Sequence, residues 1–178
     1  SLSASGEYLA LTFNGSPSSE FTPIYPDQYK NISYGFNTIN GSEGYFSKST
    51  PGEMNGPIDY SSKVSDTKFD IDRGFYQSPF NVKITTKTKG STIIYTIDGS
   101  NPSLDNGTKV VNEDPQQQIS ATLYIDKTTT LRAAAFKQGL IPSNIDTQTY
   151  LFLDEIFFSL SRAIFCWIFS IKESILSV

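Results

Sequence analysis

The chain has 178 residues, 18% of them charged, with a formal net charge of −4 and no histidine. Because the sequence lacks a basic run that would neutralise phosphates, we expect no nucleic-acid partner. Without histidine, Ser-His-Asp and Cys-His nucleophile systems cannot form, and zinc loses its commonest ligand. The single cysteine, Cys166, excludes an intrachain disulfide. We therefore expect no catalytic residue, no cofactor and no metal site.

The composition is typical of an all-β protein. Aromatic residues make up 13% of the chain, with 13 Phe and 10 Tyr, and turn residues recur at short intervals. A β-sandwich needs roughly 80 to 110 residues to bury a core. The length therefore allows one or two small modules.

Aromatic residues and turn signals alternate in the first third of the chain. Gly6–Phe13 predicts a strand, and the following Asn14-Gly15-Ser16-Pro17 predicts a hairpin turn. The segments that carry a family resemblance are Gly6–Leu11, Tyr34-Gly35, Tyr45-Phe46 and Thr50–Gly56. They resemble the closing part of a lamin-tail domain, an immunoglobulin-like fold of bacterial surface and secreted proteins. The resemblance implies that the strands opening this module are absent from residues 1–56, so that unpaired strand edges are expected there.

Asn55–Ser65 is rich in Gly, Pro, Ser and Asp, which predicts a linker at residues 57–65. A second module follows at 66–152. Its predicted strands are Lys68–Asp72, Phe80–Thr86, Thr92–Ile97, Thr122–Ile125, Thr129–Lys137 and Thr147–Phe152. Residues 98–118 predict a long connection without periodicity, which is either functional or mobile.

The most informative segment of the second module is Ser91–Pro102. Its β-branched and aromatic residues from Thr92 to Ile97 predict a half-buried strand of an antiparallel sheet. Asp98-Gly99 then supplies a side-chain acceptor and a residue that tolerates positive φ, which predicts a tight turn.

Four motifs in this module carry a second resemblance. They are Pro79–Ile84, Tyr95–Pro102, Thr130–Lys137 and Thr147–Tyr150. In this order they resemble the chitobiase/β-hexosaminidase C-terminal domain, also described as a fibronectin-III-associated or glycoside hydrolase family 29D-like β-sandwich. The resemblance covers about residues 66–152. It implies an accessory module of enzymes without a catalytic role of its own.

Candidate site residues are few. Glycosidase chemistry needs a pair of carboxylates, for which the candidates are Asp66, Asp70, Asp72, Asp98 and Asp105. We expect these residues to be solvated turn formers instead. The oxygens near Asp98 and Asp105 suit calcium but miss the EF-hand spacing. Exposed tyrosines at positions 60, 76 and 124 could stack on sugar rings, although most aromatic residues of a sandwich are core. The candidate ligand contacts are Tyr76, Asp98 and Asn101.

The last 26 residues, 153–178, break the pattern. Polar residues recur at alternating steps of three and four, which predicts a helix with Asp154 as N-cap and an apolar surface over 156–171. Three interpretations fit: a membrane-associated helix, a helix for packing or self-association, and a shifted reading frame. The third follows from a further resemblance: the order of the two modules is similar to that in the N-terminal region of spore-coat-kinase-like (CotH-type) secreted proteins. After the segment equivalent to Tyr150–Glu155 those proteins continue into a charged, proline-rich kinase-like region, which this tail does not resemble.

The sequence thus predicts an all-β chain: an immunoglobulin-like antiparallel β-sandwich, preceded by a partial second immunoglobulin-like module and followed by a hydrophobic helix. The function expected is that of a non-catalytic accessory, adhesion or spacer module in a secreted or cell-surface bacterial protein. Its expected partners are neighbouring domains of a larger protein. The alternatives are a carbohydrate-binding module, with polysaccharide as partner, and a remnant of a larger enzyme lacking its catalytic region.

Overall fold

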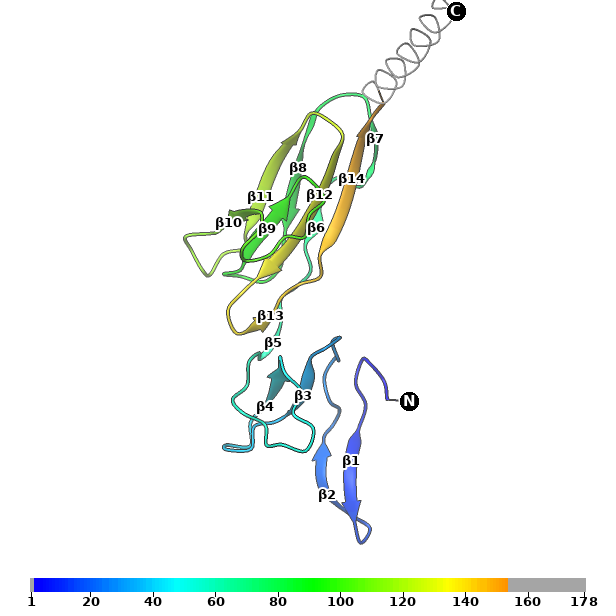
Figure 1. Cartoon of the computed structure of the whole chain (residues 1–178), viewed down its shortest axis with the longest axis vertical. Coiled ribbons are helices and arrows are strands. Elements are labelled where there is room, and N and C mark those ends of the chain that lie inside the picture. Colours follow the sequence, from blue (N-terminus) through cyan, green and yellow to red (C-terminus); the bar gives the residue numbers. More distant parts are fainter. Residues whose placement is uncertain (1, 154–178) are drawn as a thin grey trace, which may run out of the picture. The chain divides into compact units, whose positions relative to one another are not determined.

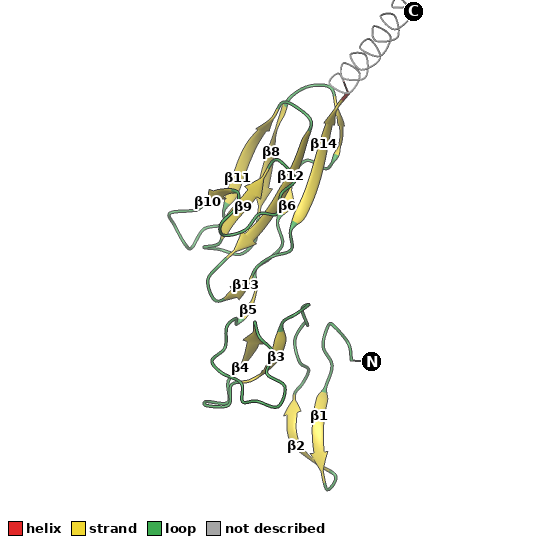
Figure 2. Cartoon of the chain, viewed as in Figure 1, coloured by secondary structure: helices red, strands yellow, loops and turns green. Residues whose placement is uncertain are grey.

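The computed structural model describes residues 2–153, which form strands and their connections (Figure 1, Figure 2). The chain divides into two compact units. Unit 1 contains the chain up to Lys63 together with Gly139–Ile141, and unit 2 contains Val64–Gln138 and the chain from Pro142 onward. The predicted C-terminal helix falls on 154–178, outside the described residues. Within the described part, no helix is long and apolar enough to cross a membrane.

Unit 1 consists of three two-stranded pairings. The first two are antiparallel, β1 with β2 and β3 with β4, and the third is the parallel pair β5 with β13. Their bounds are β1 Leu9–Phe13, β2 Ser16–Phe21, β3 Ser33–Phe36, β4 Glu43–Phe46, β5 Ser62–Lys63 and β13 Leu140–Ile141. The domain limits expected from composition, 1–56, 57–65 and 66–152, stay predictions.

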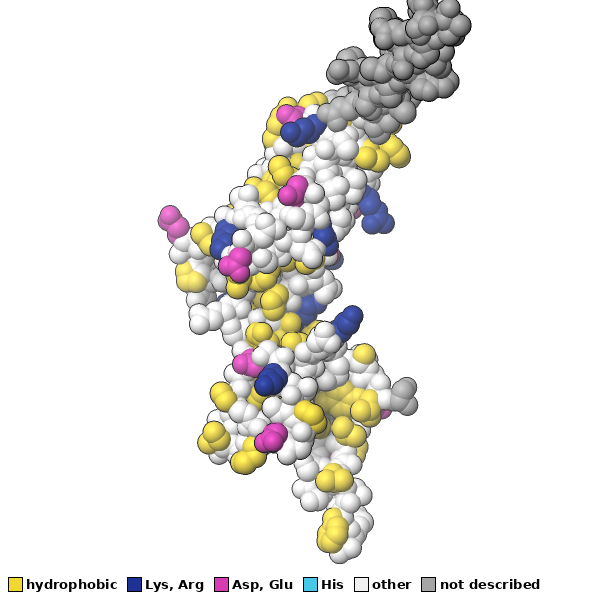
Figure 3. Space-filling view, viewed as in Figure 1, with side chains coloured by type: hydrophobic (Ala, Val, Ile, Leu, Met, Phe, Trp, Pro, Cys, Tyr) yellow, Lys and Arg dark blue, Asp and Glu magenta, His cyan; other side chains and the backbone are white. Residues whose placement is uncertain are grey.

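The hairpin β1–β2 turns at Asn14 and Gly15, as their sequence predicts. Both residues have positive φ, 51° and 78°. Two-residue hairpin loops favour such positive angles because they match the twist of the flanking strands. Leu11 and Phe13 lie on one face of β1 and are 70% and 72% exposed; Figure 3 shows apolar side chains at the surface of this hairpin.

Aromatic side chains build the interior of unit 1. Tyr45 is 4% exposed, its hydroxyl donates to the carbonyl of Asp27 at 2.8 Å, and its ring meets the Tyr34 ring edge-on at 4.9 Å. The rings of Phe21 and Phe36 stack at 4.8 Å. The alternation of aromatic residues and turns in the sequence therefore corresponds to a small aromatic core.

Unit 2 contains two sheets. The larger has the strand order β10-β9-β12-β14-β7, antiparallel except for the parallel pair β14–β7, and the smaller has the antiparallel order β11-β8-β6. The bounds are β6 Lys68–Phe69, β7 Gly74–Tyr76, β8 Phe80–Thr85, β9 Thr92–Thr96, β10 Thr108–Val110, β11 Ser120–Ile125, β12 Thr129–Phe136 and β14 Asp146–Phe152.

One apolar core fills the space between these sheets. Val82 and Ile84 from β8 and Leu123 from β11 contribute from the smaller sheet; Ile93 and Leu131 contribute from the larger. Four of these five side chains are fully buried. Two sheets enclosing one core are the architecture of a β-sandwich, so the all-β prediction is confirmed.

The expected strands of unit 2 are present, β11 and β14 with longer limits and the other four with shorter ones, but β9 is not half-buried as predicted. Ile93 and Ile94 point to opposite faces and are both 0% exposed. The 98–118 connection returns along β9, and within it β10 pairs Thr108 with Tyr95. Gly107 lies so close to β9 that an added Cβ would stand 3.0 Å from Ile94 Cγ2 and 2.7 Å from the Tyr95 carbonyl oxygen. The returning connection therefore packs closely against Ile94, on the second face of β9.

Candidate functional site

The Asp98 turn is held by its own polar groups. Asp98 Oδ1 accepts hydrogen bonds from the backbone N–H of Ser100 at 3.0 Å and from its hydroxyl at 2.6 Å. The Gly99 N–H donates to the carbonyl of Thr130 at 3.2 Å. A side-chain acceptor that bonds the backbone two residues ahead is an Asx turn. The turn predicted at Asp98 is thus confirmed.

Further polar contacts fix the rest of this connection. Asn106 Nδ2 donates to the Asn101 carbonyl at 2.8 Å and to the Ser100 hydroxyl at 3.1 Å. Arg132 on β12 donates to the Gly99 carbonyl at 3.1 Å. The Asp-Gly-Ser-Asn-Pro sequence therefore builds a closed loop anchored on the neighbouring strand.

The two donors of Ser100, its hydroxyl first and its backbone N–H second, lower the pKa of Asp98 below its ordinary value of 3.8. Hydrogen bonds to the charged form of a carboxyl favour ionisation. Asp98 is consequently a carboxylate at neutral pH. A general acid in a glycosidase needs the opposite shift, a raised pKa.

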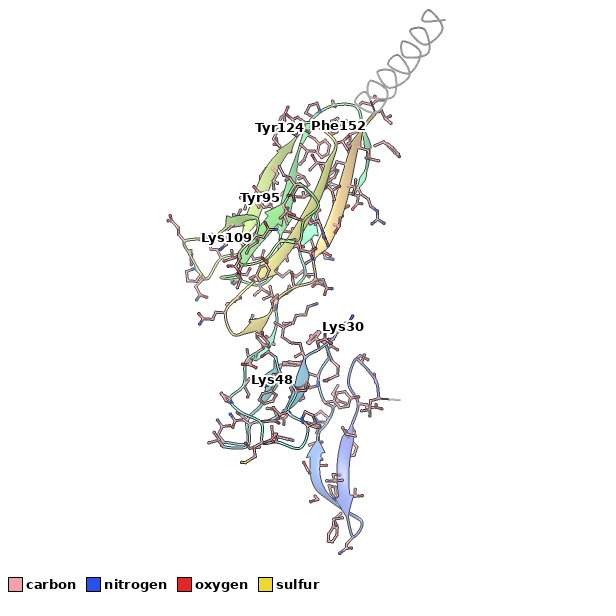
Figure 4. The ribbon with its side chains drawn as sticks, viewed as in Figure 1. Lys30, Lys48, Tyr95, Lys109, Tyr124 and Phe152 are labelled. Carbon is pink, nitrogen blue, oxygen red and sulfur yellow. The ribbon has the colours of Figure 1, made fainter. Side chains whose placement is uncertain are left out.

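A groove of about 550 Å³ opens beside this turn, between the end of β9 and the strand β11. Asp98, Ser100 and Asn106 line it from the turn, and Tyr95 lines it from β9. Figure 4 shows Tyr95 on the larger sheet and Tyr124 on β11. Tyr124 is among the residues that line the groove, and its side chain is 63% exposed.

The wall of the groove on the smaller sheet is a strand edge. Six consecutive residues line it, from Thr122 to Lys127. Successive side chains of a strand point to opposite faces, so an unbroken run of lining residues means that the groove follows the backbone itself. Because β11 pairs with β8 on one side and ends the sheet on the other, no strand among residues 2–153 pairs with this backbone edge, which is called the free edge of β11 below.

The three candidate contacts are not brought together. Asp98 lines the groove, while Asn101 is exposed in the same turn but does not line it. Tyr76 lies on β7, with β12 and β14 between it and β9. Its ring contacts Phe80 at 4.3 Å and Tyr150 at 5.7 Å, and its hydroxyl donates to the Asp72 carbonyl. Tyr76 thus packs against the core.

Two of the other candidate carboxylates, Asp66 and Asp70, accept backbone hydrogen bonds. Asp70 accepts the N–H of Lys83 at 2.6 Å, and Asp66 accepts the N–H of Asn144 at 3.1 Å. Asp105 lies in the exposed loop whose ends pair Ser103 with Asn106. Over residues 2–153, no three His, Cys, Asp or Glu side chains come together as a group that could hold a metal ion.

The places of Tyr95 and of Thr122–Ile125 in the groove were not predicted from the sequence. Tyr95 was expected only as a strand residue, and Thr122–Ile125 was expected as a strand without a place in either sheet. The available signal was the alternation Ser-Ala-Thr-Leu-Tyr-Ile, which contains no charge. It indicates a strand with one buried face but does not say which strand lies beside it.

One comparison, with models of protein families, agrees with the resemblance of unit 2. Residues 71–147 match the family model of the chitobiase/beta-hexosaminidase C-terminal domain, which is a non-catalytic accessory domain of glycoside hydrolases. The match covers less than half of the chain. Searches of curated proteins and of solved structures found no significant match.

Proposed function

We propose that this chain is a non-catalytic accessory module of a larger secreted or cell-surface bacterial protein, in which an immunoglobulin-like unit 2 spaces or presents neighbouring domains. The observation that carries the proposal is that the polar residues of the Asp98 turn bond to one another and to the neighbouring strand. Asp98 accepts its side-chain hydrogen bonds from Ser100, and Arg132 donates one to the Gly99 carbonyl. The polar residues that mark the family therefore support the fold. The match of 71–147 to an accessory domain points the same way.

The proposal extends to unit 1, as the closing part of a lamin-tail domain. Its support is the packing of Tyr34 on Tyr45, two of the residues that carry that resemblance. An arrangement of the two modules like that in spore-coat-kinase-like secreted proteins is part of the same proposal, as is the bacterial, extracellular location.

The test is an activity assay with the full chain on a chromogenic N-acetylglucosaminide and on chitooligosaccharides. We expect hydrolysis at the uncatalysed rate, and we expect Asp98→Ala to lower the melting temperature without changing that rate. Hydrolysis above background that disappears in Asp98→Ala would contradict the proposal.

The carbohydrate-binding alternative is tested by a glycan array. Since the Tyr76 ring packs against the core, the informative variant is Tyr124→Ala, whose ring is 63% exposed. A matched control is Phe75→Ala, which removes a ring that is 67% exposed on β7. The accessory proposal predicts that no glycan is bound. Glycan binding that Tyr124→Ala abolishes and Phe75→Ala preserves would favour the alternative.

A further inference from the structure

We propose that the free edge of β11 is a docking site for an extended peptide segment, which would add as a fourth strand to the sheet β11-β8-β6. This inference concerns a partner and goes beyond the accessory role proposed above. It rests on the edge, on the groove beside it and on the contrast with the other edges of unit 2.

The edge is long enough for specific pairing. β11 has six residues, which at about 3.4 Å per residue gives roughly 20 Å of backbone. Its core-facing side chains Ala121, Leu123 and Ile125 are 3%, 8% and 3% exposed and hold the strand on the sandwich. The donors and acceptors on its unpaired side are therefore presented by a fixed strand.

The edge also lacks the usual protection. Proteins block sheet edges with charged residues, proline, bulges or very short strands. The other three edge strands of unit 2 fit this rule, because β6 has two residues and includes Lys68, β10 has three and includes Lys109, and β7 has three and begins with Gly74. β11 contains no charge, no proline and no glycine, and its register with β8 is continuous.

The groove supplies room for the added strand and contacts for its side chains. It runs along Thr122–Lys127 and is bounded on the opposite side by Tyr95, Thr96 and Asp98. Tyr124 offers an exposed ring at its rim. Strand addition uses the same two components: main-chain hydrogen bonds provide affinity, and side-chain contacts provide specificity. A row of backbone donors and acceptors matches a polypeptide better than a sugar, which stacks on aromatic faces.

The probe is a synthetic peptide with the sequence of Pro79–Thr86, because β8 is the strand that pairs with β11 in this fold. It is titrated into the isotope-labelled full chain while amide chemical shifts are recorded. We expect saturable shifts at 120–127 and 95–98. Two versions with N-methyl groups on alternate backbone nitrogens serve as controls. In an antiparallel or parallel pairing only alternate amides face the partner strand, so one version should lose binding and the other should keep it.

The same titration is repeated with two variants of the protein, each of which removes one exposed aromatic ring from an edge strand: Tyr124 on β11 or Phe75 on β7. Tyr124→Ala should weaken peptide binding at least about fivefold, whereas Phe75→Ala should leave it unchanged. Equal binding by both methylated peptides, or shifts confined to residues outside the groove, would overturn the proposal. Shifts at the groove with chitooligosaccharide but not with peptide would overturn it in favour of a saccharide site.

Discussion

Asp98 accepts both of its hydrogen bonds from Ser100, two residues further along the chain. The side chain itself is exposed, so its contribution lies in the geometry of the turn rather than in burial. Ionisation is favoured in the folded state because the two donors stabilise the carboxylate. This residue therefore links the pH of the solution to the stability of the sandwich.

Asp98→Ala should lower the melting temperature at pH 7. Because the pKa of Asp98 is lowered on folding, its stabilising effect is present above the unfolded pKa near 3.8 and is lost as the pH falls through the lower folded pKa. The difference between the two proteins should therefore narrow below about pH 4. Thermal unfolding followed by circular dichroism from pH 7 to pH 2 measures it. A pH-independent difference would contradict the assigned role.

Gly107→Ala tests the close passage of the returning connection over β9. An alanine Cβ would meet the Tyr95 carbonyl oxygen at 2.7 Å, and φ is +112° there. We expect a loss of about 1 to 3 kcal/mol in the free energy of unfolding.

Gly99→Ala is the matched control, with φ +79° but only an ordinary contact at 3.4 Å to Thr130. Its cost should stay near 1 kcal/mol, because it adds backbone strain without the clash. Equal losses for the two variants in urea unfolding would show that the close passage does not matter.

At the scale of elements, β9 departs from the pattern that its sequence suggests. Alternation predicts one buried and one exposed face, whereas Ile93 and Ile94 are both fully buried. Gly107 lies against Ile94 on the second face, and it comes from a segment that shows no periodicity of its own. Burial of this face depends on a tertiary contact, which the local sequence does not encode.

Ile94→Ala should therefore destabilise the protein by about 2 to 4 kcal/mol, as for a fully buried aliphatic side chain. Ile97→Ala is the comparison on the same segment, since Ile97 is 55% exposed and should cost below about 1 kcal/mol. Urea denaturation midpoints of both variants measure the difference. Near-equal, small losses would restore the half-buried interpretation of this strand.

The strands that the sequence predicts well are those with strong alternation. Val82 and Ile84 follow this pattern on β8 and are fully buried. The strands β5, β7, β10 and β13 have two or three residues each, too short for periodicity to be visible.

The candidate site was predictable only in part for a related reason. The Asp98 turn is local chemistry and could be predicted from five adjacent residues. The separation of Tyr76 from Asp98, and the position of Tyr124 at the groove, depend on the order of strands in each sheet. That order is set by contacts between segments distant in the sequence.

At the scale of the whole molecule, the described residues form two units with separate interiors. Aromatic rings around Tyr45 build the first, and aliphatic side chains between two sheets build the second. The match to the accessory domain lies in unit 2, apart from Gly139–Ile141. The groove and the free edge of β11 also belong to unit 2, so the surface available to a partner is part of the domain that the family resemblance defines.

Hydrogen exchange of the full chain without any partner tests the free edge most directly. Each second amide of Ser120–Ile125 bonds to β8 and should exchange slowly, while the amides between them face the groove and should exchange fast. We expect this alternation along β11. Uniformly slow exchange of all six amides would show that the edge is already covered and would rule out the proposed docking site.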